Sequence, residues 1–166
     1  MTAVSVARAL DEFAIGEVPR SWDQRLAWTS GIDWHRGVQT LMRDLCRLYR
    51  DEPALNELDF EPDGFRWIDC NDADQSVLCF ERRARDGSCI VAVLNFTPVP
   101  RHGYRVGLPG KGDWREIFNS DSAFYAGSNS GNAGAIAAQP YPWMGQDHSA
   151  AITLPPLGAL ILRCDR

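Results

Sequence analysis

Long hydrophobic runs are missing from this sequence. None of its apolar stretches approaches the roughly 20 residues that a helix needs to cross a bilayer. The segment Met1 to Ala9 contains one arginine and is followed by no long apolar run, so it lacks the features of a secretory signal. We therefore expect a cytoplasmic protein with no membrane partner.

Positive charge is also in short supply. The net charge is −5, with 17 basic against 22 acidic side chains. An acidic surface repels phosphate backbones and anionic lipids, so we expect no nucleic-acid partner, although a local basic patch stays compatible with this composition.

Cysteines and histidines at the sequence spacing of a metal-binding motif are absent as well. No two of the five cysteines form a Cys-x-x-Cys pair, and their odd number and scattered spacing argue against a disulfide framework or a zinc site. We expect them to be small buried hydrophobic residues in a reducing cytoplasm. The three histidines could still meet in space, but solvated or core histidines are far more common. We predict no metal and no cofactor. The residues concerned are Cys46, Cys70, Cys79, Cys89, Cys164, His35, His102 and His148.

Catalytic signatures are equally scarce. Gly127 to Gly134 is rich in glycine but lacks the lysine of a phosphate-binding loop, so we predict a mobile surface loop. No Gly-x-Ser-x-Gly motif is present. Glycosidases use a pair of carboxylates, but the acidic residues here lie in turn-rich or strand-edge segments and are expected to form a solvated face. We predict no catalytic residue in this chain. Those acidic residues are Asp59, Glu61, Asp63, Asp69, Asp72 and Asp74.

What the chain does contain is an unbroken apolar run from Ile90 to Leu94. Such a run is typical of a strand buried on both faces. Arg85 to Ser88 is a hairpin-turn signal just upstream. Downstream, Pro98 and Pro100 cannot donate to a sheet, so the chain must leave it there. We therefore predict that this strand lies in the middle of an all-β core.

One long amphipathic helix precedes the strands. Its apolar residues recur at helical spacing and form one stripe, and Pro53 is expected to end it. The stripe is long for a helix attached to a small β domain, so we expect it to pack on more than this chain's own sheet can offer. It consists of Trp34, Val38, Leu41, Met42, Leu45, Leu48 and Tyr49.

Seven or eight short strands with turns between them follow the helix, which predicts an antiparallel β-sandwich. We place the domain boundary near Pro53 to Pro62, with residues 1–55 before it and an all-β domain over residues 56–166. A turn is expected at Asn71 to Asp74. The predicted strands are 64–68, 76–83, 90–94, 104–108, 114–118, 150–154 and 158–162.

Aromatic residues lie in or beside the predicted loops. Aromatic faces with amide and carboxylate groups nearby suit sugar rings, whose C–H faces stack while their hydroxyls form hydrogen bonds. The competing interpretation is that these rings plug the ends of the sandwich. Plugging is favoured for Trp114, whereas for Tyr141 and Trp143 the two interpretations are evenly balanced. Phe124 and Tyr125 complete the set.

Several segments resemble bacterial 1,4-α-glucan (glycogen) branching enzymes of the α-amylase superfamily. The resemblance extends from about Glu12 to Arg163. Trp34 to Gln39 is similar to the last helix of the family's catalytic barrel, and Leu58 to Trp67 to the join that follows it. The C-terminal β domain is represented by Asn95 to Arg101, Tyr104-Arg105, Trp114 to Asp121, Gly127 to Asn129, His148-Ser149 and Thr153 to Leu157.

The segment before the helix resembles a region near the family's active site. Glu12 and Phe13 are similar to a Gly-x-Glu-Phe motif after the last barrel strand, although Leu10-Asp11 departs from it. Trp22 and Trp28 are similar to the tryptophans of the Glu-Trp-Asn and Leu-Asp-Trp motifs that follow. The resemblance implies that these four residues lie near substrate.

The resemblance implies an α-amylase-type C-terminal β domain, preceded over residues 1–55 by a remnant of the (β/α)8 barrel. In the family, the nucleophile Asp, the acid/base Glu and the stabilising Asp lie on barrel strands upstream of this region. We therefore expect the chain not to branch glucan alone. In the family the apolar stripe of the helix packs against the barrel and the C-terminal domain together, so part of it is expected here to be exposed or covered by a partner. The implied partners are α-glucan and the missing barrel. A stand-alone α-glucan-binding module and a structural partner for a separate barrel chain stay open as alternatives.

Overall fold

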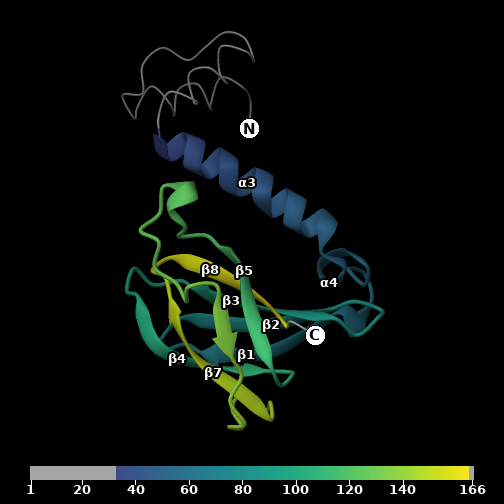
Figure 1. Cartoon of the computed structure of the whole chain (residues 1–166). Helices are drawn as coiled ribbons and strands as arrows, with labels where there is room; N and C mark the ends of the chain where they lie inside the picture. Colours follow the sequence, from purple (N-terminus) through teal and green to yellow (C-terminus); the bar gives the residue numbers. More distant parts are fainter. Residues whose placement is uncertain (1–32, 165–166) are drawn as a thin grey trace.

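The computed structural model describes residues 33–164, which form three layers (Figure 1). A helical layer lies on one face of a six-stranded sheet, and a two-stranded sheet covers the other face. The helices are α3 (Asp33–Asp51) and α4 (Pro53–Asn56), with 3-10 turns η1 (Pro62–Gly64) and η2 (Ala123–Tyr125). The strands are β1 (Phe65–Asp72), β2 (Val77–Arg83), β3 (Cys89–Asn95), β4 (Arg101–Leu108), β5 (Asp113–Asn119), β6 (Ala135–Ala137), β7 (His148–Leu154) and β8 (Gly158–Cys164).

The strand pairing confirms the predicted antiparallel sandwich. The larger sheet has the order β1-β2-β3-β8-β5-β6, and the smaller sheet pairs β4 with β7. Strand β3 lies inside the larger sheet, where Ala92 pairs with Phe80 of β2 on one side and with Ile161 of β8 on the other. Residues Ile90 to Val93 are all buried, so the prediction of a central strand buried on both faces is confirmed.

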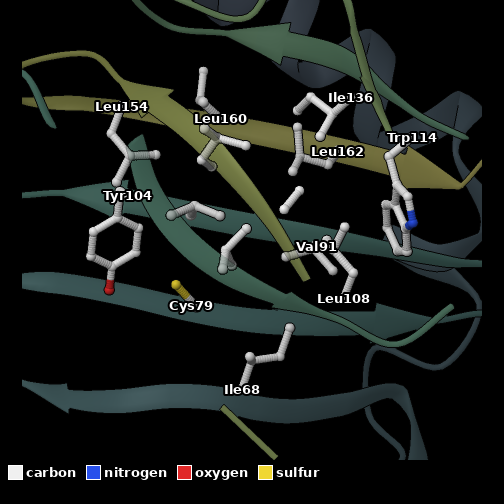
Figure 2. Close-up of a cluster of buried hydrophobic side chains, with 14 of the residues drawn as sticks. Ile68, Cys79, Val91, Tyr104, Leu108, Trp114, Ile136, Leu154, Leu160 and Leu162 are labelled. Atoms are coloured by element: carbon white, nitrogen blue, oxygen red, sulfur yellow. The ribbon is translucent and has the colours of Figure 1, made fainter. Parts of the chain in front are cut away.

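The main core fills the space between the two sheets (Figure 2). Alternate residues of each strand point into it, as the two-residue period of a strand requires. Trp114 is completely buried there, and its indole nitrogen donates to the carbonyl oxygen of Gly110 at 3.2 Å. The interpretation of Trp114 as a plug of the sandwich is therefore confirmed.

The second core lies between α3 and the outer face of the larger sheet. Leu41, Leu45 and Leu48 pack against a cluster that includes Ile90 of β3 and Ile161 of β8. The other edge of the stripe is open: Val38 is 55% exposed, Met42 51% and Tyr49 47%. The expectation that part of this stripe is exposed is confirmed.

Helix α3 ends at Asp51, two residues before Pro53, so the expectation that Pro53 ends this helix is confirmed. Pro53 is also the first residue of α4, where the missing backbone N–H of a proline costs no intrahelical hydrogen bond.

Three local expectations need correction. Of the five cysteines expected to be buried, only Cys79 is buried, whereas Cys46 and Cys70 are exposed and Cys89 and Cys164 are half-buried. The expected turn at Asn71 to Asp74 lies two residues later, since β1 continues to Asp72 and Ser76 takes the left-handed conformation with φ of 51°. Strand β6 was not predicted.

Candidate functional site

A groove of about 960 Å³ runs along the open side of the sandwich, where β1 and β4 are both at the edges of their sheets. No β-strand pairing joins β1 to β4, so side chains line the space between them. The first half of β4 and the hairpin over residues 143–146 complete the walls. The lining residues are Asp69, Asn71, Asp72, Gln75, Pro100, Arg101, His102, Gly103, Tyr104, Arg105, Trp143 and Met144.

Two carboxylates of β1 form the acidic wall of the groove. The backbone N–H of Asn71 donates to Asp69 Oδ1 at 2.9 Å, and that of Gln75 donates to Asp72 Oδ1 at 3.2 Å. Such contacts fix each carboxylate in the turn from β1 to β2. Both residues line the groove.

The floor of the groove is Tyr104 of β4, which is 8% exposed. Its hydroxyl donates to Asp72 Oδ2 at 2.9 Å and so joins β4 to β1 across the open side. Burial, the neighbouring Cys79 and the bond to Asp72 all raise the pKa of Tyr104. The tyrosine therefore stays protonated and acts as a fixed hydrogen-bond donor.

Arg101 forms part of the opposite wall. Its Nη2 donates to the carbonyl oxygen of Gln75 at 3.2 Å and to Thr97 Oγ1 at 3.4 Å. These bonds hold the entrance to β4 against the turn that follows β1. The groove is thus lined by an arginine at the start of β4 as well as by the two carboxylates of β1.

A tight hairpin carries the aromatic end of the groove. Trp143 and Gln146 exchange backbone hydrogen bonds of 3.0 and 2.9 Å. Between them, Met144 and Gly145 both have positive φ angles of 50° and 71°, as in a two-residue hairpin turn. The Trp143 side chain is 45% exposed, and the Tyr141 ring lies with its centroid 6.5 Å from that of Trp143, at an interplanar angle of 35°.

Arg105 and Ser149 hold this aromatic pair in place. The guanidinium of Arg105 lies 4.7 Å above the centroid of the Tyr141 ring, within the range of a cation–π interaction. It also donates to Gln139 Oε1 at 3.0 Å and to Ser149 Oγ at 2.9 Å. The fully buried Ser149 hydroxyl donates in turn to the carbonyl oxygen of Tyr141 at 2.7 Å. These contacts therefore hold the Tyr141 ring, and with it the aromatic pair, in a fixed position.

The structure brings together two of the site residues named from sequence, Tyr141 and Trp143. Glu12, Phe13, Trp22 and Trp28 lie outside the described residues. Phe124, on η2, is 86% exposed, and η2 packs against α3.

Sequence reasoning named Asp69 and Asp72, but only as part of a solvated acidic face, and it did not predict that they share a groove with Arg101 and Tyr104. The alternation of Tyr104 and Val106 with Arg105 predicted a strand without indicating which strand lies beside it.

This arrangement suits binding better than covalent chemistry. Two carboxylates, two arginines and Trp143 line one groove, and Tyr141 lies beside Trp143. Such a set matches a ligand with apolar ring faces and many hydroxyls. Within residues 33–164, no group of three metal-ligating side chains comes together. In the same part of the chain, no helix is long and apolar enough to span a membrane.

Comparison with known proteins gives the family. The alpha-amylase C-terminal all-beta domain matches residues 67–165. The chain is 57% identical over 132 residues to "1,4-alpha-glucan branching enzyme GlgB" of Methylobacillus flagellatus, covering 80% of this chain and 18% of that protein. It is 54% identical over 155 residues to the protein of that name from Nitrosomonas eutropha, covering 92% of this chain and 21% of that protein.

The matched region is a small part of these relatives. The protein of the same name from Thiobacillus denitrificans is 58% identical over 134 residues, which is 80% of this chain and 18% of that protein. The chain thus spans about a fifth of the length of the curated relatives it matches. Among solved structures, an α-amylase from H. orenii overlaps 74% of this chain and 19% of its own, with a TM-score of 0.45 and 15% identity. The chain belongs to the family of alpha-amylase C-terminal all-beta domains, in agreement with the resemblance seen in its sequence.

Proposed function

We propose that this chain serves as the C-terminal, non-catalytic part of a 1,4-α-glucan branching enzyme in the cytoplasm. The observation that carries the proposal is the 57% identity to a protein of that name, over 80% of the chain. Such an enzyme cuts an α-1,4-linked glucan and re-attaches the piece as an α-1,6 branch. In this proposal, residues 1–55 complete the catalytic barrel and residues 56–166 support it.

The open edge of α3 supports this role. Val38, Met42 and Tyr49 leave an exposed apolar stripe on a helix whose other edge packs on the sheet. Exposed apolar patches of this kind mark contact surfaces. Since the relatives are about five times longer than the region they share with this chain, the catalytic barrel is the occupant that we propose for this stripe.

Reconstitution of activity tests the proposal. The M. flagellatus relative would be produced without the region that matches this chain, and mixed with the purified chain. Branching is measured as loss of iodine colour from amylose. We expect no activity from either part alone and measurable activity from the mixture. Branching by this chain alone, or no gain on mixing two folded parts, would overturn the proposal.

Variants of α3 sharpen this experiment. Val38→Asp and Met42→Asp place a charge on the exposed apolar stripe and should reduce the activity of the mixture. Gln39→Asp is the matched control, because Gln39 is an exposed polar residue of the same helix. Association on a sizing column without recovery of activity would instead indicate a purely structural partner for a barrel chain.

The groove favours a second, compatible function, which is holding α-glucan through Tyr141 and Trp143. The supporting observation is that both rings are about half exposed and lie close together, and that Trp143 lines a polar groove. Electrophoresis in a native gel cast with glycogen tests it. We expect retarded migration; equal mobility with and without glycogen, at a concentration that retards a known binder, would rule it out. Glu12, Phe13, Trp22 and Trp28 remain proposed substrate neighbours in the complete enzyme.

A further inference from the structure

Two cysteines lie opposite each other at one end of the larger sheet. In the antiparallel pairing of β3 with β8, Ile90 faces Arg163. One further step along this register places Cys89, the first residue of β3, opposite Cys164, the last residue of β8. Both side chains pack against the same main core, so they project from the same face of the sheet.

The distance between neighbouring strands suits a bond between these two residues. Directly opposed residues in an antiparallel pair have Cα atoms about 4.5 or 5.5 Å apart. Disulfides form over Cα separations of about 4.4 to 6.8 Å. A bond between Cys89 and Cys164 therefore needs adjustment of the side chains but no movement of the strands.

The two thiols are also accessible. Both cysteines are half-buried, and both line one surface pocket of about 620 Å³ beside the turns at Gly87 and Gly110. Cys164 Sγ lies 3.8 Å from the carbonyl oxygen of Lys111, at the rim of this pocket. A small oxidant can reach them from solvent.

The remaining cysteines of the described chain lack this setting. Cys79 is fully buried, and burial raises the pKa of its thiol to about 12. Cys46 and Cys70 are exposed, but they lie on α3 and on the edge strand β1, on different elements from the pair.

We propose that Cys89 and Cys164 form a reversible oxidation site, at which a hydroperoxide converts the two thiols into a cross-strand disulfide. The thiolate of Cys89 attacks one oxygen of hydrogen peroxide, which breaks the O–O bond and gives a sulfenic acid and water. The thiol of Cys164 then attacks this sulfur, and the second water leaves as the S–S bond forms. Two electrons pass from the thiols to one peroxide. A dithiol reductant reverses the step.

The test is oxidation of the purified full chain, followed by denaturation, alkylation and mass measurement. We expect the peroxide-treated chain to take up two fewer alkyl groups than the reduced chain. Tryptic digestion without reduction should give one peptide pair linking Cys89 to Cys164, which disappears after treatment with dithiothreitol. The linked chain should also melt at a higher temperature than the reduced chain, because the bond closes a long loop containing β4 to β7.

Single substitutions distinguish disulfide formation at this pair from general oxidation of the cysteines. Cys89→Ser and Cys164→Ser should each abolish the linked peptide and the rise in melting temperature, whereas the matched controls Cys46→Ser and Cys70→Ser should keep both. Should a serine variant fail to fold, the peptide map of the unaltered chain still decides the question. Oxidation of Cys89 and Cys164 only to unlinked sulfinic or sulfonic acids, or linkage of either one to Cys46 or Cys70 as the main product, would overturn the proposal.

Discussion

Gly107 on β4 lies directly against the carbonyl oxygen of Trp143: a Cβ atom at position 107 would stand 2.5 Å from that oxygen. It would also approach Cγ of Gln146 to 2.9 Å. The hairpin that presents Trp143 to the groove can therefore rest on β4 only because residue 107 has no side chain.

Gly107→Ala should displace this hairpin. Because the nearest obstacle is a backbone atom and not a flexible side chain, we expect a loss of about 1–3 kcal/mol in the free energy of unfolding, measured by urea denaturation, and weaker retention in a glycogen gel. Gly110→Ala is the matched control, since its Cβ would meet nothing nearer than 3.8 Å. Equal stability of the two variants would contradict the close packing of this hairpin.

The aromatic pair makes a separate prediction about affinity. Removal of either ring, as Tyr141→Ala or Trp143→Ala, should weaken glycogen binding by about two- to tenfold, which corresponds to the loss of one stacking contact. Phe124→Ala removes an aromatic ring that is 86% exposed but belongs to η2, which packs against α3, so it should bind like the unaltered chain. Affinity comes from migration at a series of glycogen concentrations. An equal effect of all three variants would show that the groove has no special part in binding.

The large elements of this fold could be predicted because their sequence patterns are strong. The apolar run of β3 marks a strand buried on both faces, and the stripe of α3 marks a helix with one packed edge. Strand β6 escaped prediction because it has three residues, of which only Ile136 is buried. Such a segment is too short to show a period.

The groove could not be predicted because its parts come from distant segments. Tyr104 and Asp72 share a hydrogen bond across 32 residues of sequence, and Arg105 and Ser149 across 44. Composition indicated that Tyr141 and Trp143 suit sugars, but only the fold places Arg105 over one ring and Gly107 under the hairpin. Local patterns carry no information about which edge strands lie next to each other.

Glu81 gives a prediction about stability. Its carboxylate is fully buried, at 2.8 Å from Arg66 Nη2 and 2.6 Å from Arg83 Nε. A buried charge that loses its partners is strongly destabilising, so the double variant Arg66→Ala/Arg83→Ala should lose about 3–5 kcal/mol of unfolding free energy in urea titrations. Adding Glu81→Leu to this variant should restore much of the loss, because it removes the uncompensated charge.

The exposed pair of Arg85 and Glu61 supplies the control for this cluster. Exposed ion pairs contribute about 0–1 kcal/mol, so Arg85→Ala should change stability little. If Glu81→Leu makes the double variant still less stable, the loss comes from the packing of the arginine stems and not from the buried charge.

The last prediction concerns pH and Asp59, which accepts hydrogen bonds from the Tyr49 hydroxyl at 2.8 Å and from Arg82 Nη2 at 2.7 Å. These donors join α3 and the segment after α4 to β2, and they hold the pKa of Asp59 below its ordinary value of 3.8. A carboxyl group with a lowered pKa in the folded state stabilises the fold fully above its unfolded-state pKa and loses this contribution as the pH falls through the folded-state pKa.

The stability difference between the unaltered chain and Asp59→Asn should therefore be constant near neutral pH and shrink as the pH falls below 3.8. Tyr49→Phe removes the largest single effect on this pKa but leaves the hydrogen bond from Arg82, so its loss of stability should follow the same pH dependence with a smaller amplitude. Urea titrations across this range measure both differences, and a difference that stays constant down to strongly acidic pH would show that the carboxylate form of Asp59 does not hold these elements together.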